Sequence, residues 1–119
     1  MSEDQLINNW ETEIRRGVIQ LLVLSVLTEG DLHGKEICNR IWHRTNQLIS
    51  VPLGTVYPLL RRYVNERMID TYKPIGDQRK TMYSLNDRGA LFYRRVLELW
   101  QRYSVAVSNL FHFKEEDTE

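Results

Sequence analysis

A nearly unbroken apolar run from Val18 to Leu27 constrains the fold of this chain more than any other feature. Eight of its ten residues are apolar, and only Gln20 and Ser25 interrupt it. The run lies in a predicted helix from about Leu6 to Glu29, and a helix that is hydrophobic around its whole circumference must be buried on nearly all sides. It is far shorter than the roughly 20 residues that span a bilayer. In a chain of 119 residues we therefore expect a central core helix, or one covered by a partner subunit.

Two shorter helices are predicted next, and Gly30 is a plausible stop for the first helix. The second helix is expected from about Gly34 to Thr45, with Trp42 as a core residue on its apolar stripe. The third starts between Pro52 and Thr55 and ends near Met68. Two helices joined by a short turn, the second with outward arginines, are typical of a helix-turn-helix.

The start of the third helix decides the role of Pro58. If Thr55 is the N-cap, Pro58 falls in the first turn and loses no hydrogen bond. If the helix begins at Pro52, Pro58 is interior and the helix should kink there. The sequence leaves both alternatives open.

A β-hairpin and a long last helix complete the predicted fold. The hairpin flanks are rich in Thr and Tyr, with the turn signal Gly76-Asp77 between them. Asn86 is a good N-cap for a helix up to about Phe113. The chain is thus predicted to be mainly α with a small β-hairpin. Residues 1–85 form a winged helix-turn-helix with its wing at about 70–85, residues 86–113 a C-terminal dimerisation helix, and residues 114–119 an acidic tail expected to fray.

The charge distribution favours nucleic acid as a partner, although the formal net charge is zero. The segment from Lys35 to Lys80 contains nine basic and four acidic residues, so a basic centre lies between two acidic ends. A charged surface that meets only solvent would give the same count. The charge pattern alone therefore leaves both interpretations open.

The third helix and the hairpin tip supply the candidate DNA contacts. Gly54 and Pro58 have little bulk, so the backbone there could approach DNA closely, and Arg61 is a natural bidentate donor to guanine or phosphate. Arg79 and Lys80 have no packing role at a hairpin tip, and phosphate contact is their simplest use. The full set of candidates is Lys35, Gly54, Thr55, Tyr57, Pro58, Arg61, Arg62, Asn65, Arg79 and Lys80. An ordinary amphipathic helix with a solvated arginine pair is the alternative.

Three stretches resemble the PadR family of winged-helix transcriptional regulators. Leu27–Ile37 (LTEGDLHGKEI) resembles the entry into the family's second helix, Gly54–Arg62 (GTVYPLLRR) its recognition-helix motif, and Arg79–Gly89 (RKTMYSLNDRG) its wing and the start of its last helix. The resemblance covers residues 14–100, and Lys35, Met82 and Pro52-Leu53 depart from the family pattern. It implies a homodimer formed by the last helix with help from the first, and operator binding, usually as a repressor.

The last helix carries more apolar residues than one face packed on a small domain can use, which predicts an interface. Trp100 has two interpretations. It is either an interface anchor, a role in which tryptophan is enriched, or a platform for planar aromatic ligands at the dimer centre. The second follows from resemblance to the subfamily with a single C-terminal helix. Trp10, Ile14 and Tyr103 are the other candidates for the interface or ligand site.

Features of enzymes and metalloproteins are missing from the sequence. We find no phosphate-cradling glycine motif, nucleophile elbow or paired carboxylates, and the histidines are scattered, so no activity, cofactor or metal is predicted. Cys38 is the single cysteine, which indicates a reducing compartment and hence the cytoplasm. The acidic N-terminus is a poor signal peptide, and no membrane association is expected.

The leading hypothesis is a homodimeric, sequence-specific transcriptional regulator that binds double-stranded DNA. It acts as a repressor, with a small aromatic molecule as candidate effector. Two alternatives stay open: a winged helix used as a protein-interaction module, which zero net charge slightly favours, and an architectural DNA binder without sequence preference.

Overall fold

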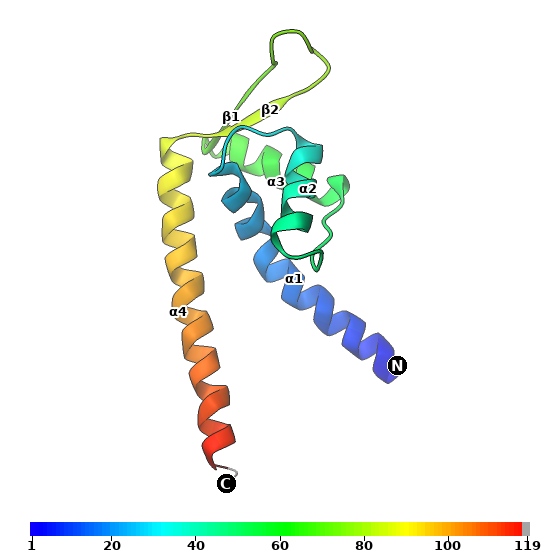
Figure 1. Ribbon diagram of the computed structural model, residues 1–119, viewed down its shortest axis with the longest axis vertical. Coiled ribbons are helices and arrows are strands. Elements are labelled where there is room, and N and C mark those ends of the chain that lie inside the picture. The colour runs from blue at the N-terminus through cyan, green and yellow to red at the C-terminus, as the bar shows by residue number, and fades with distance from the viewer. Residues whose placement is uncertain (118–119) are drawn as a thin grey trace.

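The computed structural model describes residues 1–117, and Thr118 and Glu119 of the expected acidic tail lie outside the described residues. Its elements are α1 (Glu3–Leu27), α2 (Gly34–Arg44), α3 (Leu53–Asn65), β1 (Ile69–Tyr72), β2 (Met82–Leu85) and α4 (Asp87–Asp117). This order confirms the predicted class, mainly α with one small hairpin. Figure 1 shows a head of α2, α3 and the C-terminal part of α1, with the wing above it. Two legs extend below the head, residues 3–17 of α1 and residues 96–117 of α4.

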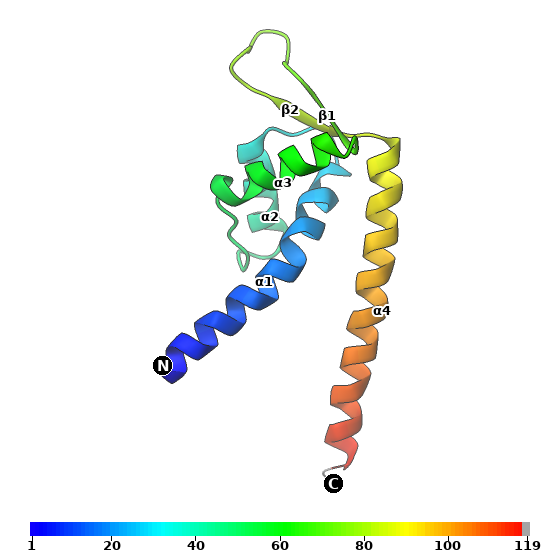
Figure 2. The same ribbon diagram turned by 180° about the vertical axis from the view of Figure 1, so that it is seen from behind.

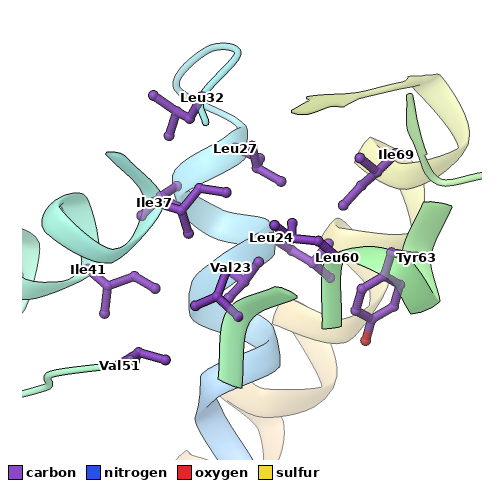
Figure 3. Packing of buried hydrophobic residues seen from close by; sticks show 12 residues of the cluster. Val23, Leu24, Leu27, Leu32, Ile37, Ile41, Val51, Leu60, Tyr63 and Ile69 are labelled. Atoms are coloured by element: carbon purple, nitrogen blue, oxygen red, sulfur yellow. The ribbon is translucent and has the colours of Figure 1, made fainter. Parts of the chain in front are cut away.

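The C-terminal half of α1 forms the centre of the core (Figure 3). Val23 and Leu24 have 0% and 1% of their surface exposed, and residues of α2, α3 and β1 surround them. The core comprises Val23, Leu24, Val26, Leu27, Leu32, Ile37, Ile41, Val51, Val56, Leu60, Tyr63 and Ile69. The prediction of all-round burial was correct only for this half. A helix of 25 residues is longer than the head is wide, so its first turns project as an exposed leg.

Local hydrogen bonds set the two ends of α1. It begins before the expected Leu6 because Ser2 and Gln5 form a capping box, in which each backbone N–H donates to the other's side chain, at 2.9 and 3.2 Å. It ends before Gly30, which is therefore not the helix stop that we expected. Thr28 is the C-cap instead, and its hydroxyl donates to a carbonyl of the last turn at 2.6 Å.

The structure decides between the two alternatives for α3. Pro52 is its N-cap and offers no side-chain hydrogen bond, so Pro58 lies inside the helix. Because proline has no N–H, the carbonyl of Gly54 lacks its usual helical donor. The helix ends before the expected Met68, since Arg67 adopts a left-handed conformation with φ of 60°.

The wing is joined to the rest of the head by backbone hydrogen bonds. β1 and β2 pair antiparallel, with Ile69 opposite Leu85 and Tyr72 opposite Met82. The N–H of Tyr83 also donates to the carbonyl of Leu32 at 2.8 Å, and the reverse bond measures 3.1 Å. The base of the wing is thereby fixed to the connection between α1 and α2, while residues 73–81 form the loop that projects in Figure 1.

The start of α4 is capped as predicted, because the N–H of Gly89 donates to Oδ1 of Asn86 at 2.9 Å. The first turns pack on the head, where the ring of Phe92 lies 6.0 Å from that of Tyr63. The helix continues to Asp117, beyond the expected end near Phe113, so residues 114–117 are helical rather than frayed.

Trp42 was predicted to belong to the core, and this was wrong. Ile37 and Ile41 of α2 are fully buried, whereas 37% of the Trp42 surface is exposed. One residue turns a helix by 100°, so Trp42 points well away from the direction in which Ile41 meets α1. The buried apolar face of α2 is therefore narrower than the spacing of apolar residues in the sequence indicated.

We expect Gly89→Ala to destabilise the fold by about 1–3 kcal/mol, because a methyl group cannot be inserted into close packing without strain. A Cβ at this position would overlap the carbonyl oxygen of Met68 and lie 2.6 Å from Cδ1 of Leu85. Gly54→Ala is the matched control, since its Cβ would meet nothing within 4 Å, and this variant should be as stable as the wild type or slightly more so. Thermal melts followed by circular dichroism compare the three proteins. Equal melting temperatures for Gly89→Ala and the wild type would contradict this packing.

Candidate nucleic-acid interface

One face of α3 is buried and the opposite face carries the predicted DNA contacts. Val56 and Leu60 are fully buried against the core. The exposed positions of α3 are Gly54, Thr55, Tyr57, Pro58, Arg61, Arg62 and Asn65. The helix therefore presents all of its predicted candidates to the outside, as an ordinary amphipathic surface helix also would. Two clefts beside α3, described below, distinguish it from an ordinary surface helix.

A cleft of about 430 Å³ lies between α3, the start of α2 and the wing, and we call it the wing-side cleft. Lys35 of α2, Tyr57 of α3, and Arg79 and Lys80 of the wing line it together. These four candidates come from three separate elements, and the fold places them around one space. Three cations around a tyrosine form a surface suited to an anionic chain such as a phosphate backbone.

Gly34 explains why Tyr57 can lie in this cleft. A Cβ on Gly34 would stand 2.8 Å from Cε1 of Tyr57 and 2.9 Å from its hydroxyl oxygen. The ring thus packs directly on the backbone at the first residue of α2. Tyr57 therefore sets the position of α3 relative to α2, in addition to any contact with a partner.

Arg61 lies on the wing side of α3. Burial raises the pKa of Tyr83 at the base of the wing, and Tyr57 raises it further, while the positive charge of Arg61 opposes both. Tyr83 therefore keeps its phenolic proton, and Arg61 is close enough to act on it. Arg61 also follows Tyr57 by one helical turn on the exposed face of α3.

Two of the basic residues counted in the sequence belong to a different site. Arg44 donates to Glu29 at 2.6 Å, and Arg40 lies 3.7 Å from the same carboxylate. The hydrogen bond from Arg44 holds the pKa of Glu29 below its ordinary value. These two arginines join the end of α1 to α2, so the excess of positive charge in the middle of the sequence does not all lie on one surface.

The candidates for the interface or ligand site fall into two groups. Trp100 and Tyr103 of α4 line a cleft of about 300 Å³ against Gly17 and Leu21 of α1. Trp10 and Ile14 do not line this cleft, but lie exposed on the α1 leg. The exposed apolar residues of the legs are Leu6, Ile7, Trp10 and Ile14 on α1, and Leu99, Trp100, Tyr103, Val105, Val107, Leu110, Phe111 and Phe113 on α4.

A second cleft beside α3 contains residues that the sequence analysis missed. It measures about 490 Å³ and lies between α1 and the N-terminal half of α3, so we call it the α1-side cleft. Arg15 and Arg16 of α1 line it together with Thr55. The available signal was that these are the only two basic residues of α1. The charge count missed them because it followed the chain from residue 35 onward.

Metal binding and redox chemistry receive no support from the described residues. Among the side chains that the structure describes, no group of three His, Cys, Asp or Glu residues could hold a metal ion. Burial raises the pKa of the Cys38 thiol, which disfavours the reactive thiolate. Within residues 1–117, no helix is both long enough and apolar enough to cross a membrane.

Comparison with known proteins identifies the family. The profile of the transcriptional regulator PadR-like family matches residues 23–95, which is more than half of the chain. The protein therefore belongs to the PadR-like family of transcriptional regulators. This confirms the resemblance seen in the sequence, and it confirms that the chain is a regulator rather than an enzyme.

Solved structures agree with this assignment. A PadR family transcriptional regulator from Eggerthella lenta is 26% identical, with a TM-score of 0.79, and the match covers 91% of this chain and 94% of that one. A transcriptional regulator from Clostridium thermocellum is 27% identical, with a TM-score of 0.75 over 82% and 96% of the two chains. Bacillus subtilis PadR, solved in complex with operator DNA, is 27% identical, with a TM-score of 0.59 over 67% of this chain and 45% of that one.

We expect Gly34→Ala to lower both stability and DNA affinity, because the new methyl group displaces the Tyr57 ring. The stability loss should be about 1 kcal/mol or less, because the methyl group meets the far end of a side chain that is 38% exposed and can turn outward. In a Tyr57→Ala background the same change should cost nothing, giving a coupling of at least about 0.5 kcal/mol. Denaturant unfolding of the four proteins of this double-mutant cycle measures the coupling. Additive losses would show that Gly34 and Tyr57 are not in contact.

Proposed function

We propose that this protein is a homodimeric repressor that binds specific sites in double-stranded DNA. The convergence of Lys35, Arg79 and Lys80 around Tyr57, beside the exposed face of α3, carries this proposal. A likeness to a PadR protein solved with its operator supports it. It follows that the protein acts where the DNA is, which we take to be the cytoplasm.

In this proposal α3 enters the major groove and the wing contacts the backbone. A helix with its side chains is about 10–12 Å across, and the major groove is about 12 Å wide. Arg61 and Arg62 are exposed on the entering face and provide planar donors for base edges or phosphates. Arg79 and Lys80 then meet a phosphate backbone from the wing, a contact that positions α3 without reading sequence.

Replacing Arg61, Arg62, Arg79 and Lys80 together with alanine should abolish salt-dependent DNA binding, with affinity falling by at least about 100-fold. The four side chains are exposed, so the circular dichroism spectrum should not change. The measurement is retention of fragmented genomic DNA at two salt concentrations, followed by sequencing of the bound fragments. A few palindromic sites retained by the wild type alone support a specific regulator.

Other results of this experiment would point to the alternatives. Uniform retention of all fragments by the wild type would favour an architectural binder. No retention at low salt would favour a protein-interaction module.

The exposed apolar residues of the two legs support the homodimer. Trp10 and Ile14 lie one helical turn apart on α1 and are 68% and 64% exposed. Trp100, Tyr103 and Phe111 of α4 are exposed as well. Contiguous apolar patches larger than a few hundred Å² are rare on monomers. A second copy that covers both legs would bury these residues and hold two α3 helices in fixed register for a palindromic site.

Ile14→Glu should convert the dimer into monomers and lower the affinity for a palindromic operator by more than about tenfold, because each α3 then binds without its partner. Sedimentation velocity and a binding titration measure the two effects. Leu48→Glu is the matched control, because Leu48 is 78% exposed in the connection between α2 and α3 and should leave the dimer intact. A wild-type protein that sediments as a monomer at micromolar concentration would contradict the homodimer.

The cleft at Trp100 and Tyr103 gives the repressor a place for an aromatic effector. Its volume of about 300 Å³ lies at the small end of ligand sites, and a second copy would enclose it further. Trp100 is 44% exposed, so part of the indole is accessible to an aromatic ligand. An occupant there would sit between α1 and α4 and act on the interface that spaces the two α3 helices.

A further inference from the structure

The α1-side cleft lies on the opposite side of α3 from the wing-side cleft. Tyr57 of α3 lines the wing-side cleft, whereas Thr55 and Leu59 line the α1-side cleft. Figure 2 shows the N-terminal end of α3 on the same side of the head as the leg of α1. The helix that we place in the major groove is therefore flanked by basic residues on both sides.

The arginines of this cleft point away from the apolar stripe of the same helix. At 100° per residue, Arg15 and Arg16 are directed roughly 120–140° from the mean direction of Trp10 and Ile14. A partner subunit that covers the stripe would leave these guanidinium groups accessible. The two faces of the α1 leg are thus suited to two different partners.

Both guanidinium groups are available to an anion. Arg16 lies 3.3 Å from the carboxylate of Glu13, but these side chains are 72% and 63% exposed, and such surface pairs are weak. No ion pair involves Arg15 among the side chains that the structure describes. The polar rim continues to Ser50 and Thr55 at the start of α3, where Pro52 provides no side-chain cap.

We propose that Arg15 and Arg16 bind backbone phosphates of the DNA strand opposite to the one that the wing contacts. A helix in the major groove has one phosphate backbone on each side, because the groove is about as wide as the helix. The wing-side cleft meets one backbone and the α1-side cleft meets the other. This site rests on the proposed function, since it requires α3 to lie in the groove.

The two-sided contact has a consequence for how α3 is held. Phosphate contacts fix the register and orientation of a protein on the duplex. Contacts from one side alone leave a helix free to roll about its axis, whereas contacts from both sides oppose this rotation. Arg15 and Arg16 lie on α1, whose C-terminal half forms the centre of the core, so their contacts with DNA act on α3 through this packed helix.

The test compares two pairs of neighbouring arginines. Arg15→Ala/Arg16→Ala is compared with Arg94→Ala/Arg95→Ala, which removes the same charge from exposed positions on α4. Affinity for an operator duplex is measured over a range of salt concentrations. We expect the slope of log K against log salt to fall by about 0.9 for each phosphate that the first variant no longer binds, and to stay unchanged in the second. Arg15→Lys/Arg16→Lys should keep most of the slope because the charge is retained.

Phosphate ethylation interference then locates the contacts. With the wild type, ethylation should interfere on both strands that border the major groove of each half-site, and Arg15→Ala/Arg16→Ala should abolish the interference on one strand of each half-site only. An unchanged salt slope, or interference that persists on both strands of a half-site, would overturn the proposal. So would equal losses in the lysine and alanine variants. Failure of the proposed function would give a different result, because the wild-type protein itself would then bind no DNA.

Discussion

The burial of one half of α1 is the constraint on which the rest of the structure depends. Val23 and Leu24 are enclosed by side chains from α2, α3 and β1, so these elements take their positions from the same few turns of helix. The other half of α1 leaves the head as a leg. One continuous helix therefore joins the apolar surface that we assign to the dimer with the core beneath α3.

Tyr63 shows how closely α3 is tied to both α1 and α4. Its hydroxyl donates a hydrogen bond to the side chain of Gln20 on α1, and its ring contacts Phe92 on α4. Burial raises the pKa of Tyr63, so the phenol keeps the proton that this bond requires. A second polar contact joins the hydroxyls of Tyr93 and Ser25 at 3.1 Å, again between α4 and α1. α3 therefore meets α1 and α4 at one packed junction in the head, and each leg continues from this junction within the same helix.

The order of elements could be predicted because its signals are local. The apolar run ending at Leu27 and the cap at Asn86 each depend on residues only a few positions apart. The errors depend on packing between elements. Trp42 has the spacing of a core residue, but it lies 100° around α2 from the buried Ile41 and is 37% exposed. Arg15 and Thr55 are 40 positions apart in the sequence, so only the fold could reveal that they share a cleft.

The zero net charge of the chain is consistent with a DNA-binding surface once the charges are placed in space. Arg40 and Arg44 share the carboxylate of Glu29 away from this surface, while the cations beside α3 converge from separate elements. Non-specific affinity comes almost entirely from phosphate contacts, and it is strongest for proteins with a large positive excess. A neutral protein with a few well-placed cations gains less from random DNA and relatively more from a matched site. The charge arrangement therefore favours a sequence-specific regulator over an architectural DNA binder.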